Sequence, residues 1–314
     1  MLMLAGCNGT RYARFGGYAQ GGTWSVKANL KGVKEKPKAI QQHIESILYE
    51  IDTTLSGYNK ASQLSRYNDG EDVELSPMFM EVLDAAEKFR IETDGAVNCA
   101  AGELFDIWGF GFKTDSLPSE EMVRQAMART ETRPKLNFNA IAQGYSCDKV
   151  AEYLYSIGVK DMLVDIGEIF CDGRNPAGKP WRVGVDRPKD GNNSPGTDMD
   201  GIWESDGSAR GIVTSGNYRK FYVKDGVKYS HTIDPRTGYP VQHNLLSATI
   251  LAPTAMAADA YATYCMVAGY ETGRDFILSR PDLEGYLIRA AASGTESESG
   301  MTEWASPGFK LTQN

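Results

Sequence analysis

The chain has 314 residues, of which 41% are hydrophobic, with 33 Lys and Arg against 41 Asp and Glu. This apolar content supports a packed globular core and excludes a disordered chain or a coiled coil, while the length permits two domains or one large one. The net charge of -8 argues against a broad nucleic-acid-binding surface, because phosphate recognition depends on clustered Lys and Arg.

The first residues contain a pattern typical of a bacterial lipoprotein signal. Small residues precede the cysteine in Leu-Ala-Gly-Cys (4–7), and cleavage before Cys7 would leave it at the N-terminus with a lipid attached. The segment before Cys7 lacks Lys and Arg, whereas export signals have a charged region and about 7–15 apolar residues. Of a truncated signal and a chance resemblance, we favour the first. We therefore expect residues 1–20 to form a signal remnant and a flexible tether.

Periodicity and turn residues predict the elements of the first half. Alternation predicts a strand over 23–31, and apolar residues at helical spacing predict a helix over 38–54. Ser76-Pro77 predicts the start of a helix that runs to about Glu92. The remaining expectations are a polar loop over 56–63, a glycine- and aromatic-rich loop over 95–111, and a short helix over 118–129.

The second half is richer in strand signals. The expected elements are a helix near 140–157, strands over 162–167, 181–185, 211–214 and 246–252, a hairpin over 221–230, and an Ala-rich helix over 254–267. We expect the stretch Asp190–Asp206 to be an exposed loop. Because strands and helices do not alternate strictly, the sequence favours an α+β fold over a doubly wound sheet.

Three histidines are present, and only one lies in a pattern that suggests chemistry. We expect His43 and His243 to be structural or solvated. His231 follows the hairpin and precedes Asp-Pro-Arg-Thr-Gly (234–238), which predicts a tight turn. A histidine held beside such a turn can act as a general base at neutral pH, although the local sequence fits a structural role equally well.

The Ala-rich helix carries a carboxylate and a hydroxyl on one face. Asp259 and Thr263 are four residues apart, and such a pair suits a hard cation that also keeps water and phosphate ligands. The alternative is a solvated Asp and a Thr that bonds back to its own helix. Residues 137–145 precede a helix whose free N–H groups could receive phosphate. The chain has no GxGxxG, Walker or Gly-x-Ser-x-Gly motif, which argues against those classes.

The motifs together resemble the ApbE family of flavin transferases. The matching segments are Asn-Ala-Ile-Ala-Gln-Gly-Tyr (139–145), Thr-Ser-Gly-Asn-Tyr-Arg (214–219), Tyr-Ser-His-Thr-Ile-Asp-Pro-Arg-Thr-Gly-Tyr-Pro (229–240) and Ala-Pro-Thr-Ala-Met-Ala-Ala-Asp-Ala-Tyr-Ala-Thr (252–263). The resemblance extends from about Gly21 to Phe309 and implies a single domain over 21–314. The implied fold is α+β and T-fold-like, with mixed, largely antiparallel sheets flanked by helices.

The resemblance implies a Mg²⁺-dependent FAD:protein FMN transferase that attaches FMN through a phosphoester bond to a Thr or Ser of a target flavoprotein. It implies His231 as the base that takes the proton from the acceptor hydroxyl. The implied FAD-binding residues are Tyr58, Ala96, Val97, Asn98, Asn137, Gln143 and Ile233. The implied metal-binding residues are Ala140, Asp259, Ala262 and Thr263.

The family is commonly exported, so the resemblance also implies a place for the protein in the cell. We expect it to be lipid-anchored at the cell envelope through Cys7, facing the periplasm or exterior, with no nucleic-acid partner. Its expected target is a flavoprotein such as a membrane redox-complex subunit. The alternatives from the same resemblance are an FAD pyrophosphatase that releases FMN and AMP, and a flavin-binding protein without catalysis.

Three positions depart from the family pattern. Gln143 stands where lysine is usual, and this substitution removes a charge near the ligand. Asn98 stands where aspartate is usual, and the segment 165–168 (Asp-Ile-Gly-Glu) is one glycine short of the usual Gly-Gly-Glu. None of these involves His231 or Asp259, so we expect them to alter affinity more than reaction type.

Overall fold

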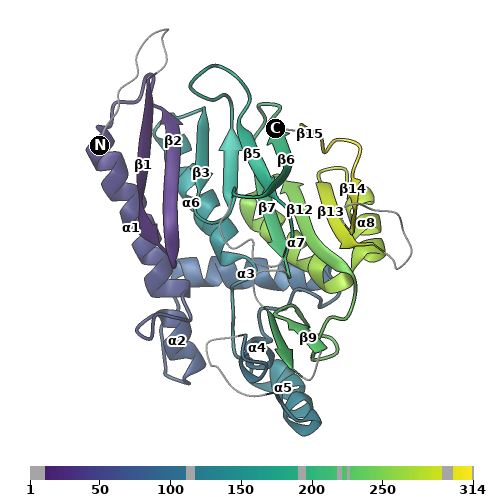
Figure 1. Cartoon of the computed structure of the whole chain (residues 1–314). Coiled ribbons are helices and arrows are strands. Elements are labelled where there is room, and N and C mark those ends of the chain that lie inside the picture. Colours follow the sequence, from purple (N-terminus) through teal and green to yellow (C-terminus); the bar gives the residue numbers. More distant parts are fainter. Residues whose placement is uncertain are drawn as a thin grey trace.

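The computed structural model describes residues 11–110, 117–189, 196–217, 221–224, 227–291 and 300–312. Cys7 and the hairpin turn at Asp225-Gly226 therefore lie outside the described residues. Figure 1 shows helices packed against a broad sheet, with a smaller group of elements at the bottom of the view. The α+β prediction is confirmed.

The broad sheet has eight strands in the order β1-β2-β3-β4-β7-β12-β13-β14, and each neighbouring pair is antiparallel. Its strands are β1 (Tyr12–Ala19), β2 (Gly22–Asn29), β3 (Met162–Asp165), β4 (Ile169–Asp172), β7 (Arg210–Gly216), β12 (Leu245–Ala252), β13 (Glu284–Ala290) and β14 (Met301–Ala305). The central strand β12 is buried over nearly its whole length, because both of its faces are covered.

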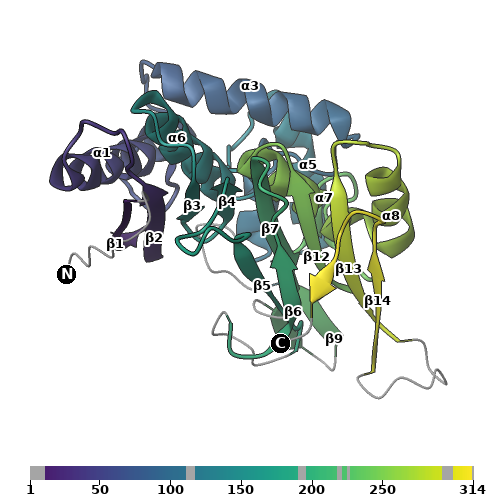
Figure 2. The ribbon, with the colours of Figure 1, turned by 90° about the horizontal axis from the view of Figure 1, so that it is seen from above.

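Helices cover one face of this sheet (Figure 2). They are α1 (Pro37–Leu55), α3 (Pro77–Glu92), α6 (Ala142–Ser156), α7 (Ala255–Ala268) and α8 (Tyr270–Leu278). The opposite face packs against a small sheet in the order β15-β6-β5, formed by β5 (Arg182–Asp186), β6 (Met199–Glu204) and β15 (Leu311–Thr312). The sheet therefore has an apolar core on each side.

Local sequence explains where the main helices begin and which face they bury. In α1, Ile40, Ile44 and Leu48 recur at helical spacing and are all buried. The Ser76 side chain accepts a hydrogen bond from the Phe79 N–H and caps α3, and proline follows at the first helical position.

Most of the remaining elements form the smaller group at the bottom of Figure 1. They are α4 (Gly102–Ile107), α5 (Glu120–Thr132), the hairpin of β8 (Phe221–Lys224) and β9 (Val227–Ser230), and the short pair β10 (Ile233–Asp234) and β11 (Tyr239–Pro240). An apolar cluster that includes Leu104, Trp108, Val123 and Ile233 joins α4 and α5 to the turn after His231. The Trp108 indole N–H also donates to the Gly238 carbonyl at 2.8 Å.

Three local predictions are wrong. Residues 12–19 of the expected tether form β1, because they pair along their whole length with β2 and bury Ala13 and Phe15. The expected loop over 95–111 contains the whole of α4. The stretch Asp190–Asp206 contains β6, whose Trp203 is buried against the broad sheet. In each case tertiary pairing or burial outweighs a polar or glycine-rich local sequence. The loop expected over 56–63 is confirmed, because α2 (Gln63–Asn68) begins only at its last residue.

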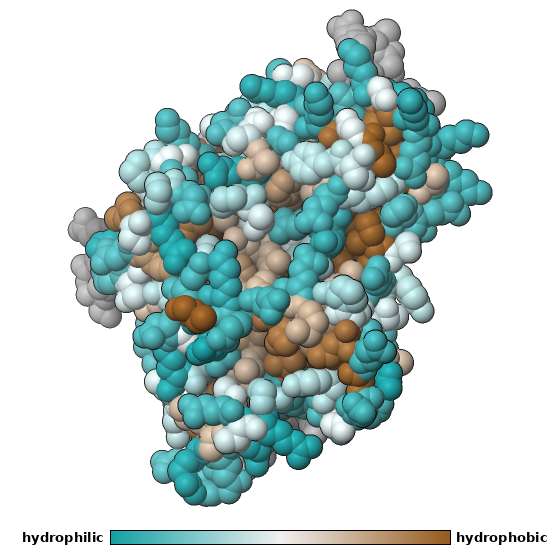
Figure 3. Space-filling view, turned by 180° about the vertical axis from the view of Figure 1, so that it is seen from behind, coloured by the Kyte–Doolittle hydropathy of each residue, from teal (hydrophilic) through white to brown (hydrophobic). Residues whose placement is uncertain are grey.

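Polar side chains cover most of the face opposite to the view of Figure 1, with smaller apolar patches between them (Figure 3). None of the described helices combines the length and apolar content needed to cross a lipid bilayer.

Candidate functional site

Helix α7 carries the predicted pair Asp259 and Thr263, and its start is fixed by two capping groups. Thr254 accepts a hydrogen bond from the Ala257 N–H at 3.1 Å. The carboxylate of Asp148, on α6, accepts hydrogen bonds from the N–H groups of Ala255 and Met256, each at 2.8 Å. The first turn of α7 is therefore held by its own cap and by a carboxylate from α6.

The N-terminal turn of α6 lies directly against α7, and Gly144 makes this possible. A Cβ at position 144 would lie 2.4 Å from the Ala255 carbonyl oxygen, so only glycine allows the two backbones to come this close. The Gly144 N–H donates to Oδ2 of Asp259 at 3.2 Å. The contact thus brings residues 140–144 next to a carboxylate 115 positions away in the sequence.

The Asp259 carboxylate is deeply buried, and the described residues place no cation against it. The residue is 5% exposed, and burial raises the pKa of its carboxyl well above the usual range. The negative charge of Asp148 nearby raises this pKa further, whereas the Gly144 N–H opposes the shift. Within the described part of the chain, no Lys or Arg forms an ion pair with Asp259.

This environment fits a hard divalent cation. A buried carboxylate is costly unless it is paired, and a metal ion would supply the missing positive charge. Thr263 lies one turn further along α7 and is partly exposed. Among the described residues, no group of three or more His, Cys, Asp and Glu is placed to hold a metal. An ion here would therefore also need backbone, water or phosphate oxygens, as Mg²⁺ accepts.

Several predicted FAD-binding residues gather at the turn before α6. The Asn139 amide donates to the Tyr58 hydroxyl at 3.4 Å, and the Tyr58 ring is 64% exposed. The Asn137 N–H donates to the Cys99 carbonyl at 2.8 Å, which places Asn98 beside the same turn. Ala140 is part of the turn itself and is partly exposed.

Gln143 lies against the turn between β3 and β4. A Cβ at Gly167 would lie 2.4 Å from Nε2 of Gln143, so the side-chain amide occupies the space that Gly167 leaves open. Gly167 has a φ of +88°, which favours glycine in any case. The Gln143 side chain is thus accommodated by the shape of this turn.

His231 lies between β9 and β10 and is partly buried. Its ring meets Phe110 edge-on, with 6.4 Å between ring centroids. Strand β10 contacts α7, which brings the segment that carries His231 and Ile233 to the helix that carries Asp259.

Four predicted residues can act only through their backbone. Ala96, Val97, Ile233 and Ala262 are each 1% exposed or less, so their side chains belong to the core. The Val97 N–H is already bonded to the Thr93 hydroxyl at 3.0 Å. A ligand would therefore meet these positions at main-chain atoms.

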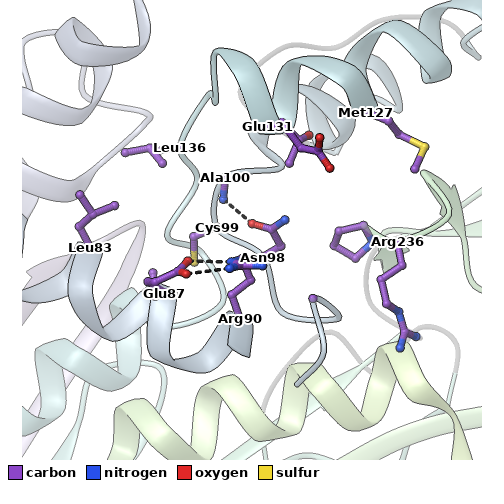
Figure 4. Close-up of a pocket in the computed structure, with 14 residues that line it drawn as sticks. Leu83, Glu87, Arg90, Asn98, Cys99, Ala100, Met127, Glu131, Leu136 and Arg236 are labelled. Atoms are coloured by element: carbon purple, nitrogen blue, oxygen red, sulfur yellow. Dashed lines mark hydrogen bonds and ion pairs between the residues drawn. The ribbon is translucent and has the colours of Figure 1, made fainter. Parts of the chain in front are cut away.

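A cavity of about 540 Å³ borders the Asn98 segment (Figure 4). It lies between α3, α5 and the turn at Pro235-Arg236, with the Glu87–Arg90 ion pair on one side. Of the predicted site residues only Asn98 lines it, and its Oδ1 accepts a hydrogen bond from the Ala100 N–H at 3.0 Å. Cys99 also lines the cavity, but burial raises the pKa of its thiol to about 12, so it is not a nucleophile at neutral pH.

The other two histidines have structural contacts. His43 stacks on Tyr153 with 4.1 Å between ring centroids. Nε2 of His243 lies 2.9 Å from the Met266 carbonyl oxygen, and Nδ1 accepts from the Leu245 N–H at 3.3 Å.

Sequence reasoning missed the positioning contacts of Gly144 and Asp148. The signal for Gly144 was present, because an interior helix glycine costs about 1 kcal/mol and usually has a packing reason.

Comparison with known proteins gives a consistent result. The family model described as "ApbE family" matches residues 21–287. The FAD:protein FMN transferase of Escherichia coli is 32% identical to this chain, and the match covers 94% of this chain and 87% of that protein. The FAD:protein FMN transferase of Vibrio cholerae is also 32% identical, and the match covers 99% of this chain and 96% of that protein.

Solved structures agree with this match. The flavin transferase ApbE from Vibrio cholerae has a TM-score of 0.79 and 30% identity, over 95% of this chain and 98% of that chain. The flavinyl transferase ApbE from Pseudomonas stutzeri has a TM-score of 0.81 and 29% identity, over 95% of each chain. The chain therefore belongs to the ApbE family of flavin transferases.

Proposed function

We propose that this enzyme is a Mg²⁺-dependent FAD:protein FMN transferase that attaches FMN to a Thr or Ser hydroxyl of a target flavoprotein. The observation that carries the proposal is the buried Asp259 carboxylate, which faces the N-terminal turn of α6 and has no ion-pair partner among the described residues. The names of the E. coli and V. cholerae relatives support the substrate and the group transferred.

Asp259 and Thr263 would hold the magnesium ion, together with the carbonyl oxygens of Ala140 and Ala262. When bound, Mg²⁺ neutralises negative charge on a pyrophosphate, which is a main requirement of phosphoryl transfer. The N–H groups of Ile141 and Ala142 already donate to the Phe138 carbonyl, and that of Gly144 donates to Asp259. Among the described contacts this leaves the N–H of Gln143 at the start of α6, which would bind a phosphate oxygen.

His231 would act as the general base. It would accept the proton of the acceptor hydroxyl while that oxygen forms its bond to the FMN phosphorus of FAD. The phosphorus–oxygen bond to the AMP half breaks in the same step, and AMP leaves. Tyr58 would stack on a ring of FAD, since its exposed face lies beside the Asn137–Ala140 turn. Asn98, Asn137 and Gln143 would orient the nucleotide.

We also propose that the protein is lipid-anchored at the cell envelope and acts on a membrane redox-complex subunit. The Leu-Ala-Gly-Cys sequence at 4–7 supports the anchor. Metabolic labelling with a radioactive fatty acid tests it: label in the native chain but not in Cys7→Ser is expected, and no label in the native chain would refute it.

The test of the transferase activity uses the purified full-length protein with FAD, Mg²⁺ and a target domain that bears a flavinylation-type Ser or Thr. Covalent flavin fluorescence on the target is expected. Release of FMN and AMP without labelling would show a pyrophosphatase, and tight FAD binding with neither product would show a binding protein.

Two variants separate the roles. His231→Ala should abolish transfer but retain FAD binding, whereas the control His43→Ala should transfer normally, since His43 stacks on Tyr153 of α6. Asp259→Ala should lose the Mg²⁺-dependent activity. Unchanged transfer by His231→Ala would remove it as the base, and normal Mg²⁺-dependent activity of Asp259→Ala would refute the metal assignment.

A further inference from the structure

A group of exposed cations lies at one end of the broad sheet, on a chain whose net charge is -8. We name this group the basic patch, and it consists of Arg11, Lys31, Lys34, Lys36, Lys38 and Lys160, all exposed. Within the described part of the chain, none of the six forms an ion pair.

Hydrogen bonds fix three separate segments of the patch next to one another. Oδ1 of Asn29 accepts from the N–H groups of both Arg11 and Lys31, each at 3.1 Å. The Asn29 N–H donates to the carbonyl of Asp161, the neighbour of Lys160, at 2.9 Å. Lys34 and Lys36 follow Lys31 in the segment that leads into α1, and Lys38 lies in the first turn of that helix. The fold therefore brings this charge together from different parts of the sequence.

The position of two of these lysines opposes helix stability. Lys36 is the N-cap of α1 and makes no side-chain capping bond, and Lys38 lies in the first turn, which has no acidic residue. The N-terminus of a helix carries partial positive charge, so Asp, Glu or Ser is favoured there and lysine is disfavoured. Cations at these positions cost stability, which suggests that they serve a contact with an anionic partner.

The patch and the candidate site lie at opposite ends of the same strands. Strand register places Tyr12 opposite Asn29, Ala28 opposite Met162 and Met162 opposite Asp172, all at the end that carries the patch. The other end of β3 and β4 carries the Gly167 turn, against which Gln143 lies.

The chain segment that leads from Cys7 enters the described structure at the patch itself. Three residues separate Cys7 from Arg11. Four extended residues span at most about 14 Å. A lipid on Cys7 would hold a bilayer surface within this distance of the patch.

We propose that the basic patch is a docking surface for an anionic lipid bilayer, and that docking there directs the Asp259 end of the molecule away from the membrane. Each Lys or Arg near an anionic leaflet strengthens binding by about fivefold, and the attraction falls off within a Debye length. The proposal does not depend on the transferase activity.

The test uses the full chain carrying Cys7→Ser, so that no lipid contributes, and measures flotation with vesicles. Vesicles of phosphatidylglycerol and phosphatidylcholine are compared with vesicles of phosphatidylcholine alone. We expect salt-sensitive binding to the anionic vesicles only. The triple variant Lys34→Glu, Lys36→Glu, Lys38→Glu should bind at least about a hundredfold more weakly, because three favourable charges are lost and reversed.

The control triple variant Lys60→Glu, Lys88→Glu, Arg124→Glu changes the net charge equally outside the patch and should keep its vesicle binding. The patch variant should melt at the same temperature as the parent or higher, since acidic residues suit the start of α1. Its FMN transfer to a soluble target should be unchanged. Equal vesicle binding by the two triple variants would overturn the proposal. The proposal would also be wrong if the Cys7→Ser parent bound duplex DNA and did not bind the anionic vesicles.

Discussion

The contact between α6 and α7 gives the sharpest test of how the site is assembled, and Gly144→Ala perturbs it directly. The added Cβ would lie 2.4 and 2.6 Å from the carbonyl oxygen and carbon of Ala255 and 2.7 Å from Cα of Met256. Carbon atoms in van der Waals contact lie about 3.5–4.0 Å apart. All three neighbours are backbone atoms, so no side-chain rotation relieves the overlap and α7 must move.

Overpacking of this kind costs about 1–3 kcal/mol. Weakening the hydrogen bond from the Gly144 N–H to the Asp259 carboxylate destabilises the fold by about 1.5–3 kcal/mol more. The higher helix propensity of alanine offsets about 1 kcal/mol of this loss. We therefore expect a loss of about 1.5–5 kcal/mol in the free energy of unfolding. The Mg²⁺ concentration for half-maximal FMN transfer should also rise, because Asp259 is displaced.

Urea denaturation measures the first effect, and a Mg²⁺ titration of transfer measures the second. Gly22→Ala is the control, because a Cβ at that position meets nothing within 4 Å. If Gly144→Ala unfolds at the same urea concentration as the native protein and needs no more Mg²⁺, the argument from close backbone approach is wrong.

Three further predictions concern contacts around the site and in the core. Burial lowers the pKa of His243 below its usual 6.5, and the hydrogen bonds of the ring fit its neutral form. The stability that the neutral ring contributes is therefore fully present above pH 6.5, and it is lost as the pH falls below that value. Chemical denaturation from pH 7.5 to 5 should show this loss, and His243→Gln should reduce it; an unchanged pH profile would refute the assignment. Trp108→Phe loses the hydrogen bond to Gly238 and should cost about 1 kcal/mol in thermal unfolding, whereas no change would show that the bond is not stabilising. Asp148→Ala leaves two N–H groups of α7 without their acceptor and should destabilise the fold by about 1–3 kcal/mol; a variant as stable as the native protein would contradict that cap.

Local sequence predicted the main helices because their signals are local. Ser76-Pro77 determines the start of α3, and the spacing of Ile40, Ile44 and Leu48 determines the buried face of α1. The short elements β6 and α4 were missed, since they depend on pairing and burial against distant parts of the chain.

The sequence by itself predicted which residues carry chemistry. It determined that Asp259 and Thr263 share a helical face, because the helix period fixes that relation. Only the tertiary structure decided that Asp259 meets the start of α6, that Asp148 caps α7, and that Ala96 and Val97 can offer only backbone atoms. These facts depend on contacts between residues more than a hundred positions apart or on burial, and no local periodicity encodes either. The same holds for the basic patch, which combines cations from three segments into one surface.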